Sequence, residues 1–200
     1  MSRRLSSFLA ACLAALLIVP AASALRVHVR VEGKTRTIFG SAEPTLTVKA
    51  NALDALESAS VDGEFYYHVS QTSFGPYVDQ VGRYVAGAST GWVFKVNGVS
   101  PPVGADKVTL KDGDRVLWYW ATFGPSGGPP TLLLKAGSKR GCYRVLAQDD
   151  TGKSKAARGA RLHMDRRSVR VGASGTACAG KHRGLVTATL KGAVRSNAVR

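Results

Sequence analysis

The sequence predicts an α+β half followed by an all-β half, and three observations support this division. Residues 25–130 contain 10 Lys+Arg and 10 Asp+Glu, whereas residues 131–200 contain 16 Lys+Arg and 3 Asp+Glu. Aromatic side chains are distributed in the opposite sense, because 13 of the 15 lie between Phe39 and Phe123. Between the halves, the segment GPSGGPP can continue neither a strand nor a helix. We therefore expect domains at residues 25–123 and 131–200, joined by a linker at residues 124–130.

Residues 1–24 have the pattern of a cleaved secretory signal peptide. Two arginines occupy positions 3 and 4, residues 9–20 are apolar, and residues 22–24 (ASA) match a signal peptidase site. The apolar run is shorter than the ~20 residues that span a bilayer, and the rest of the sequence has no second long apolar run. We predict cleavage near Ala24, a secreted or cell-surface protein, and no membrane span in the mature chain.

Export would determine the state of the cysteines. Residues 9–12 (LAAC) also resemble a bacterial lipobox, which would lipidate Cys12, but removal of a signal peptide leaves only Cys142 and Cys178. A pair of cysteines in an oxidising compartment predicts a disulfide, which would close a loop of about 35 residues and contribute roughly 3–4 kcal/mol. Zinc would need further ligands at suitable spacing, and the nearest histidine is His182. We predict no metal site.

The first half reads as several strands around one helix. Valines at positions 27, 29 and 31 alternate with charged or polar residues, which predicts a half-buried strand. A short helix is expected to begin after Asn51 as N-cap, with Asp54 in its first turn and Leu53, Leu56 and Ala59 on one apolar face. In chain order, the expected strands are residues 26–32, 35–39, 65–69, 92–96, 108–110 and 115–123. This pattern is typical of a small α+β domain.

The second half reads as strands and turns only. Its short strands have nearly regular spacing, which favours a β-sandwich of immunoglobulin-like type. Seventy residues give a small hydrophobic core, for which a disulfide is a common addition. The expected strands are residues 132–134, 142–147, 160–164, 169–171, 176–178 and 185–190.

Several ordered motifs of the first half resemble a known family. Residues 91–98 (GWVFKVNG), 104–105 (GA), 110–116 (LKDGDRV) and 118–120 (WYW), with Tyr77 and Val78 before them, are similar to the transcobalamin and intrinsic-factor C-terminal-like family. In bacteria this domain occurs in exported proteins and is mostly of unknown function. The resemblance covers residues 25–123 and implies a β-grasp-like fold, in which a small mixed sheet packs on one helix.

The resemblance also implies a ligand class. In the vertebrate carriers this domain closes over a corrinoid that a separate helical barrel also holds, and the present sequence contains no such barrel. Cobalamin binding would therefore require a separate partner protein, and no bound cofactor is expected otherwise. The second half is more loosely similar to bacterial immunoglobulin-like or carboxypeptidase-regulatory-like modules, at residues 152–161, 175–177, 187–189 and 194–196.

Motifs that would indicate catalysis lack their structural context. Residues 124–128 match Gly-x-Ser-x-Gly, but the two prolines that follow prevent the helix that a nucleophile elbow needs. Residues 152–154 (GKS) lack the start of a phosphate-binding loop, and residues 112–114 (DGD) lack the further oxygen ligands of a calcium loop. The four histidines are scattered along the chain. We therefore expect a protein that is not an enzyme.

Two groups of residues are candidates for binding. Trp118 and Trp120 share one face of their strand, whereas Tyr119 lies on the other, so one aromatic row is expected in the core and the other on the surface. The exposed row would stack on a small molecule or glycan, although the linker or the second half would remove this surface if it covered the row. Basic residues of the second half would contact anionic envelope polymers, such as teichoic acid, acidic polysaccharide or lipid head groups, or would serve solubility alone. The aromatic candidates are Tyr66, Trp92, Phe94, Trp118, Tyr119 and Trp120; the basic candidates are Arg158, Arg161, Arg166, Arg167, Arg170, Lys181 and Arg183.

Nucleic acid fits the second half less well than an envelope polymer does, because that half lacks the aromatic side chains that stack on bases and the protein is expected to leave the cell. The favoured function is an exported, non-catalytic binding or adhesion module at the bacterial cell surface. Corrinoid binding with a partner protein is the alternative, and a purely structural surface module is a third.

Overall fold

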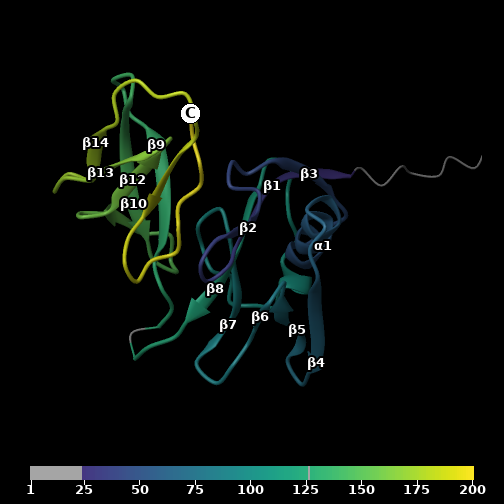
Figure 1. The fold of residues 1–200 in the computed structure, drawn as a ribbon. Coiled ribbons are helices and arrows are strands. Elements are labelled where there is room, and N and C mark those ends of the chain that lie inside the picture. The colour runs from purple at the N-terminus through teal and green to yellow at the C-terminus, as the bar shows by residue number, and fades with distance from the viewer. Residues whose placement is uncertain (1–23, 126) are drawn as a thin grey trace, which may run out of the picture.

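A computed structural model describes residues 24–125 and 127–200 of the chain. The predicted signal peptide and the lipobox at Cys12 therefore lie outside the described residues. Within the described part no helix is long and apolar enough to cross a membrane. Figure 1 shows two bodies side by side, with the N-terminal half to the right and the C-terminal half to the left.

The first half is built on a mixed sheet whose two central strands are parallel. β1 (Leu25–Glu32) pairs in parallel with β8 (Arg115–Thr122), and β7 (Thr90–Val96) pairs antiparallel with β8. On its other edge, β1 pairs antiparallel with β3 (Thr45–Val48) at its start and with β2 (Thr37–Phe39) at its end. The α+β class predicted for this half is confirmed.

Helix α1 (Ala52–Asp62) covers one face of this sheet, and the N-cap predicted for it is confirmed. The Asn51 side chain accepts hydrogen bonds from Leu53 N and Asp54 N, and the Asp54 carboxylate accepts one in return from Asn51 N. Such a reciprocal capping box satisfies backbone donors that would otherwise lack partners. The helix packs on β1, β3 and β8, on the side of the sheet away from the second half (Figure 1).

A second, antiparallel sheet lies beside β7 and was largely missed by the sequence. It consists of β4 (Tyr67–Thr72), β5 (Gly75–Val81) and β6 (Tyr84–Val85), of which only a strand near β4 was expected. The strand expected at residues 108–110 is wrong, because this segment follows a 3-10 turn (Ala105–Lys107) and forms only a single bridge, from Thr109 to Asn51. Leu110 is nevertheless buried in the core, which explains its apolar character.

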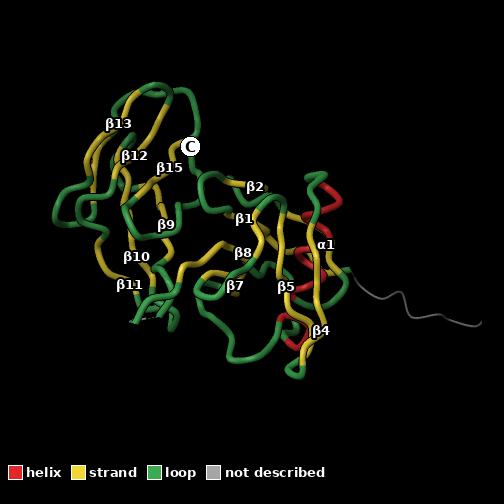
Figure 2. The backbone as a smooth tube through the Cα atoms, turned by 60° about the horizontal axis from the view of Figure 1, so that its bottom comes forward, coloured by secondary structure: helices red, strands yellow, loops and turns green. Residues whose placement is uncertain are grey.

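The second half consists of two small antiparallel sheets around one core (Figure 2). In one sheet β10 (Cys142–Gln148) has β9 (Thr131–Ala136) on one edge, and β11 (Ser154–Ala156) and β14 (Thr176–Cys178) on the other. The other sheet has the order β13–β12–β15. Its strands are β12 (Arg161–Met164), β13 (Arg167–Arg170) and β15 (Val186–Thr189).

The predicted disulfide between Cys142 and Cys178 is present. The two cysteines are directly opposite each other on β10 and β14, so the bridge joins neighbouring strands of one sheet. In antibody domains the disulfide connects the two sheets and packs against a tryptophan, and the second half contains no tryptophan. The all-β prediction is therefore confirmed, and the immunoglobulin-like type stays a prediction.

Candidate functional site

Five of the six aromatic residues predicted to form a ligand surface lie on β7 and β8. Trp92 pairs with Trp120 and Phe94 with Trp118 across these strands, so these four share one face of the sheet. This face is covered by α1 and the β4–β6 sheet. The Trp118 indole N–H donates to Ala52 O at 3.0 Å, and that of Trp92 donates to a backbone oxygen of β6 at 2.9 Å. Trp92 and Trp118 are only 2% and 3% exposed.

The opposite face of the sheet is also covered. Tyr119 is 2% exposed and packs with Ala121 and with Val194 of the C-terminal segment. Tyr66 is 59% exposed, but it precedes β4, outside the sheet that carries the other five. The exposed aromatic row is therefore not formed, because α1 and the β4–β6 sheet bury one face and the second half buries the other.

Trp120 borders a small cleft between the halves. The cleft has a volume of about 220 Å³, and its lining includes Lys34 and Arg195. The Trp120 indole nitrogen is buried and has no hydrogen-bond partner within the described part of the chain. Small-molecule pockets usually measure about 300–1,000 Å³, so this cleft is too small to enclose a corrinoid.

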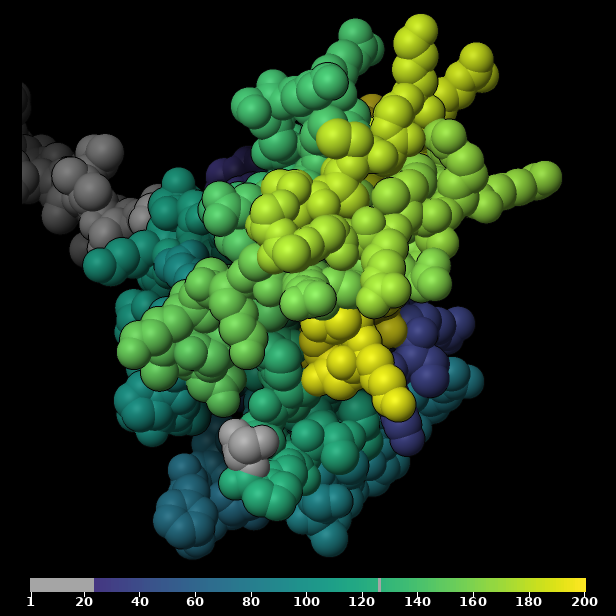
Figure 3. Space-filling view, turned by 90° about the vertical axis from the view of Figure 1, so that its left-hand side faces the viewer, coloured from purple at the N-terminus to yellow at the C-terminus, as the bar shows by residue number. Residues whose placement is uncertain are grey.

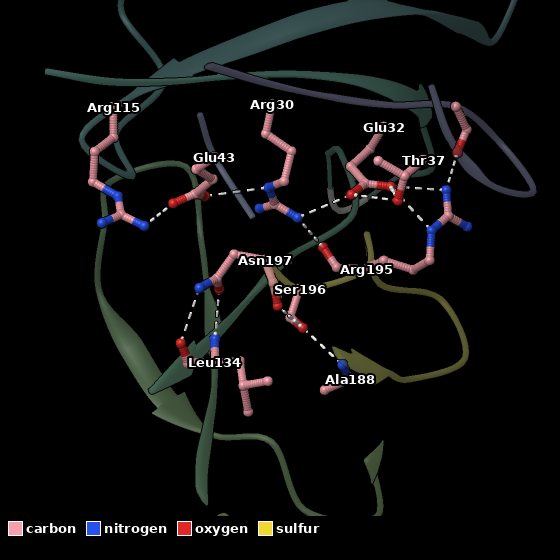
Figure 4. Close-up of polar contacts among 11 residues, drawn as sticks. Arg30, Glu32, Thr37, Glu43, Arg115, Leu134, Ala188, Arg195, Ser196 and Asn197 are labelled. Carbon is pink, nitrogen blue, oxygen red and sulfur yellow. Dashed lines mark hydrogen bonds and ion pairs between the residues drawn. The ribbon is translucent and has the colours of Figure 1, made fainter. Parts of the chain in front are cut away.

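A row of charged residues, which we call the polar seam, joins the two halves, and its central members Arg30 and Glu32 are buried (Figure 4). Arg30 contacts Glu32 at 3.1 Å and Glu43 at 3.3 Å, and Glu43 also pairs with Arg115. From the second half, Arg195 donates to Glu32 at 3.0 Å. Burial lowers the pKa of the Arg30 guanidinium, and the Glu32 carboxylate opposes this shift. The seam therefore places two carboxylates between three guanidinium groups.

Neutral hydrogen bonds anchor the C-terminal segment to the second half, and one further bond joins it to the first half. The Asn197 side chain accepts from Leu134 N at 2.9 Å and donates to Leu134 O at 3.1 Å, as a neighbouring strand would. The Ser196 hydroxyl accepts from Ala188 N at 2.7 Å. Ala198 N donates to Ser41 O of the first half. These bonds hold the last residues of the chain between the halves.

Lys95 on β7 is a third buried link. Its ammonium group donates to Asp149 O at 2.8 Å and to Thr131 Oγ1 at 3.3 Å, and lies 3.3 Å from the Asp150 carboxylate. Burial lowers the pKa of Lys95, and Asp150 partly offsets this effect. Lys95 therefore bridges the first sheet to the β10–β11 turn.

These linking residues were not found by sequence reasoning. The alternation of β1 predicted a solvent-facing side for Arg30 and Glu32, which are 3% and 0% exposed. That side faces the second half, so the half-buried prediction for this strand is wrong at its end. Only the opposite charges of Arg30 and Glu32, two positions apart on one strand, could have indicated that these side chains form an ion pair.

The seven basic candidates are all exposed, and we call them the basic surface: Arg158, Arg161, Arg166, Arg167, Arg170, Lys181 and Arg183. Arg161 and Arg170 are directly opposite on β12 and β13, on the outer face of that sheet with His163 and Ser168. Arg167 donates to Lys181 O at 2.8 Å. In Figure 3 this half faces the viewer, and long side chains project from its upper and right-hand margins.

Carboxylates do not neutralise the basic surface. Across residues 24–125 and 127–200, none of its seven members forms an ion pair. The three acidic residues of the second half have other partners. Asp149 accepts from Thr151 N and Lys153 N, Asp150 contacts Lys95, and Asp165 accepts from backbone N–H groups of the β14–β15 loop.

Within the described residues, no group of three or more His, Cys, Asp or Glu side chains is arranged to hold a metal ion.

Comparison with known families gives a match: residues 50–122 match a family described as a domain of unknown function, DUF4430. No curated protein matches the chain. The matched segment runs from the residue before the N-cap of α1 to the end of β8 and contains all the first-half motifs that carry the family resemblance, so this part of the chain is similar to DUF4430.

Proposed function

We propose that the protein is an exported, non-catalytic binding module whose basic surface holds an anionic polymer of the bacterial envelope. The observation that carries this proposal is the absence of carboxylate partners for the basic surface in the described part of the chain. Unpaired guanidinium and ammonium groups attract polyanions over several ångströms and retain them in a salt-dependent manner.

The placement of Arg161 and Arg170 supports a role beyond solubility. Like charges directly opposite each other on neighbouring strands destabilise a sheet, so an external anion between them would relieve repulsion. The neighbouring strands supply no carboxylate at this position, since the residues around them on the outer face are His163, Ser168 and, on β15, Thr187 and Thr189. A surface that is locally unfavourable without a ligand is consistent with binding.

We further propose a β-grasp-like fold for the first half and an immunoglobulin-like sandwich for the second. The central parallel pair β1–β8 and the helix on one face support the former. Two small antiparallel sheets around one core support the latter. In this proposal the main sheet of the first half has a structural role, because both of its faces are covered. The first half then recognises a small molecule or glycan only at a surface outside that sheet.

The proposal is tested by binding of purified protein to isolated cell walls at low salt. The variant Arg161→Glu with Arg170→Glu reverses two charges but keeps a like-charge pair, so we expect normal folding and at least tenfold weaker retention. Lys49→Glu with Lys111→Glu is the matched control, since it makes the same charge change on exposed lysines of the first half. Equal loss in both variants, or no retention of the wild type, would contradict the proposed function.

A titration with hydroxocobalamin examines the corrinoid alternative in the same preparation. Without a partner protein we expect no heat of binding, because the cleft beside Trp120 is small and the aromatic rings of β7 and β8 are covered. Micromolar binding by the isolated protein would favour the corrinoid function over the envelope role.

A further inference from the structure

The second half contains a groove that shares only Lys181 and Arg183 with the basic surface. It lies between the β9–β10 turn and the β14–β15 loop, beside the disulfide, and has a volume of about 1230 Å³. We call it the basic groove because five exposed basic residues line it: Lys139, Arg140, Lys181, Arg183 and Arg200. None of the five forms an ion pair within residues 24–125 and 127–200.

The single acidic side chain of the groove has a structural role. Asp165 accepts a hydrogen bond from Gly184 N at 2.9 Å and lies 3.4 Å from Arg183 N. It therefore fixes the loop that carries Lys181 and Arg183 and does not form an ion pair with a cationic side chain. With five cationic side chains and one carboxylate side chain, the side chains of the lining have a formal net charge of +4, counting histidine as neutral.

The two rims of the groove are held together without a ligand. The Cys142–Cys178 bridge connects them, and Ala179 N donates to Gly141 O at 2.7 Å. Gly141 has a positive φ of 74°, and a side chain there would meet Gly180 O at 2.7 Å, so the close approach of the rims requires glycine. A preformed site loses less conformational entropy on binding.

The floor of the groove is also ordered. Tyr143 is buried, and its hydroxyl is hydrogen bonded to His182 Nε2, while His182 Nδ1 donates to Gly184 O at 3.0 Å. This arrangement holds the imidazole at the groove surface between the two cationic rims. His182 is thus a natural reporter for an occupant.

Size and shape indicate what the groove would accept. Its volume exceeds the ~300–1,000 Å³ of small-molecule pockets, so an extended chain fits better than a compact ligand. A concave site also suits a chain better than a flat bilayer surface. The positive lining selects closely spaced oxyanion groups, such as phosphate or sulfate esters.

From these features we propose that a linear polymer of phosphate or sulfate esters lies in the basic groove, held between Lys139 and Arg140 on one rim and Lys181 and Arg183 on the other. This inference rests on the proposed function for the class of ligand and adds the place where the chain lies. The outer face of β12 and β13 then supplies general attraction, and the groove supplies the stable contact.

Inorganic polyphosphate is the first probe, and heparin is the sulfate arm. Arg140→Gln with Arg183→Gln removes two charges from the groove, and Lys49→Gln with Lys111→Gln removes two exposed charges from the first half as the matched control. We expect the groove variant to bind polyphosphate at least tenfold more weakly and the control less than threefold. The slope of log affinity against log salt should fall by about 0.7 for each groove cation removed that contacts the polyanion.

Nuclear magnetic resonance locates the polymer independently of the variants. His182 reports on the groove, and His163, beside Thr189 on the outer face of β12, reports on the sheet. We expect polyphosphate to shift the ring signals of His182 and to leave those of His163 nearly unchanged. Shifts of His163 alone would overturn the groove even if binding is tight.

The remaining outcomes separate the groove from the proposed function. Tight binding by the wild type that the groove variant retains would contradict the groove alone, whereas no polyanion binding by the wild type would contradict both. Stronger binding to phosphatidylglycerol vesicles than to either polymer, with His182 unchanged, would replace the chain with a membrane surface. Cys142→Ser with Cys178→Ser removes the covalent link between the rims, and we expect the folded variant to bind the polymer more weakly than the wild type.

Discussion

Arginine has opposite roles in the polar seam and on the basic surface. In the seam, Arg30 and Arg195 share the buried carboxylate of Glu32, and every charge lies within reach of an opposite one. On the basic surface, Arg161 faces Arg170 and no carboxylate pairs with either in the described part of the chain. The number of basic residues therefore says little about function, whereas the partners that the fold supplies distinguish structural charges from those available to a ligand.

The largest expected effect comes from removing one charge of the seam. Glu32→Gln would leave the Arg30 and Arg195 guanidinium groups without their common carboxylate, and Glu32 is fully buried. Breaking a buried pair in this way costs about 3–5 kcal/mol. We expect a corresponding loss in the free energy of unfolding, measured by denaturant titration.

The exposed residue Glu64 provides the control for this change. Glu64→Gln should alter the free energy of unfolding by less than about 0.5 kcal/mol, as surface substitutions usually do. If Glu32→Gln were equally neutral, the seam would not hold the halves together, and its contrast with the basic surface would disappear.

A neutral contact that anchors the C-terminal segment within the second half should contribute less. Asn197→Ala removes both hydrogen bonds to Leu134 and leaves a buried N–H and C=O without partners. Such unsatisfied groups cost roughly 1–3 kcal/mol. We expect a lower thermal midpoint than for Gln71→Ala, an exposed truncation in β4, and equal midpoints would show that the C-terminal segment is not anchored by this residue.

Local patterns in the sequence predicted local structure well. The capping residues Asn51 and Asp54 fixed the start of α1, and the two cysteines indicated the disulfide. Alternation on β1 identified its core valines but could not show that a second body covers Arg30 and Glu32. The same limit applies to Tyr119, because burial against a distant segment such as Val194 leaves no periodic signal near either residue.

The candidate site was predicted only in part for a related reason. Exposure of the basic residues follows from their local composition, since charged side chains are almost never buried without partners. The groove depends on which loops the strand order brings together, and Lys139 and Arg183 are far apart in sequence. Neither spacing nor charge density contains that information.

A smaller effect of the opposite sign is expected on the basic surface. Arg170→Glu replaces a like-charge pair with Arg161 by an opposite-charge pair, which should stabilise the protein by about 0.2–1 kcal/mol. The same change should weaken polyanion binding. Arg166→Glu, on the exposed turn before β13, should weaken binding without the gain in stability. Loss of stability in Arg170→Glu would contradict the view that this pair is strained without a ligand.

The smallest expected effect concerns the pH dependence of Lys95, a buried cation whose partners are mostly neutral oxygens. Its pKa is lowered in the folded protein by burial, so in the interval below the ordinary value of 10.5 the unfolded chain binds more protons than the folded one. Stability must then rise with pH through that interval, because the cost of burying the charge disappears as the ammonium group loses its proton.

Lys95→Met isolates this contribution, since methionine fills similar space and does not titrate. We expect the free energy of unfolding of the wild type to increase relative to the variant between pH 7 and pH 10. Denaturant titrations at both pH values measure this comparison. If the difference in free energy of unfolding between the wild type and Lys95→Met were the same at both pH values, the charge of Lys95 would be fully compensated by its partners. Lys95 would then belong with the ion pairs of the seam, and cations without a compensating partner would occur only on the surface.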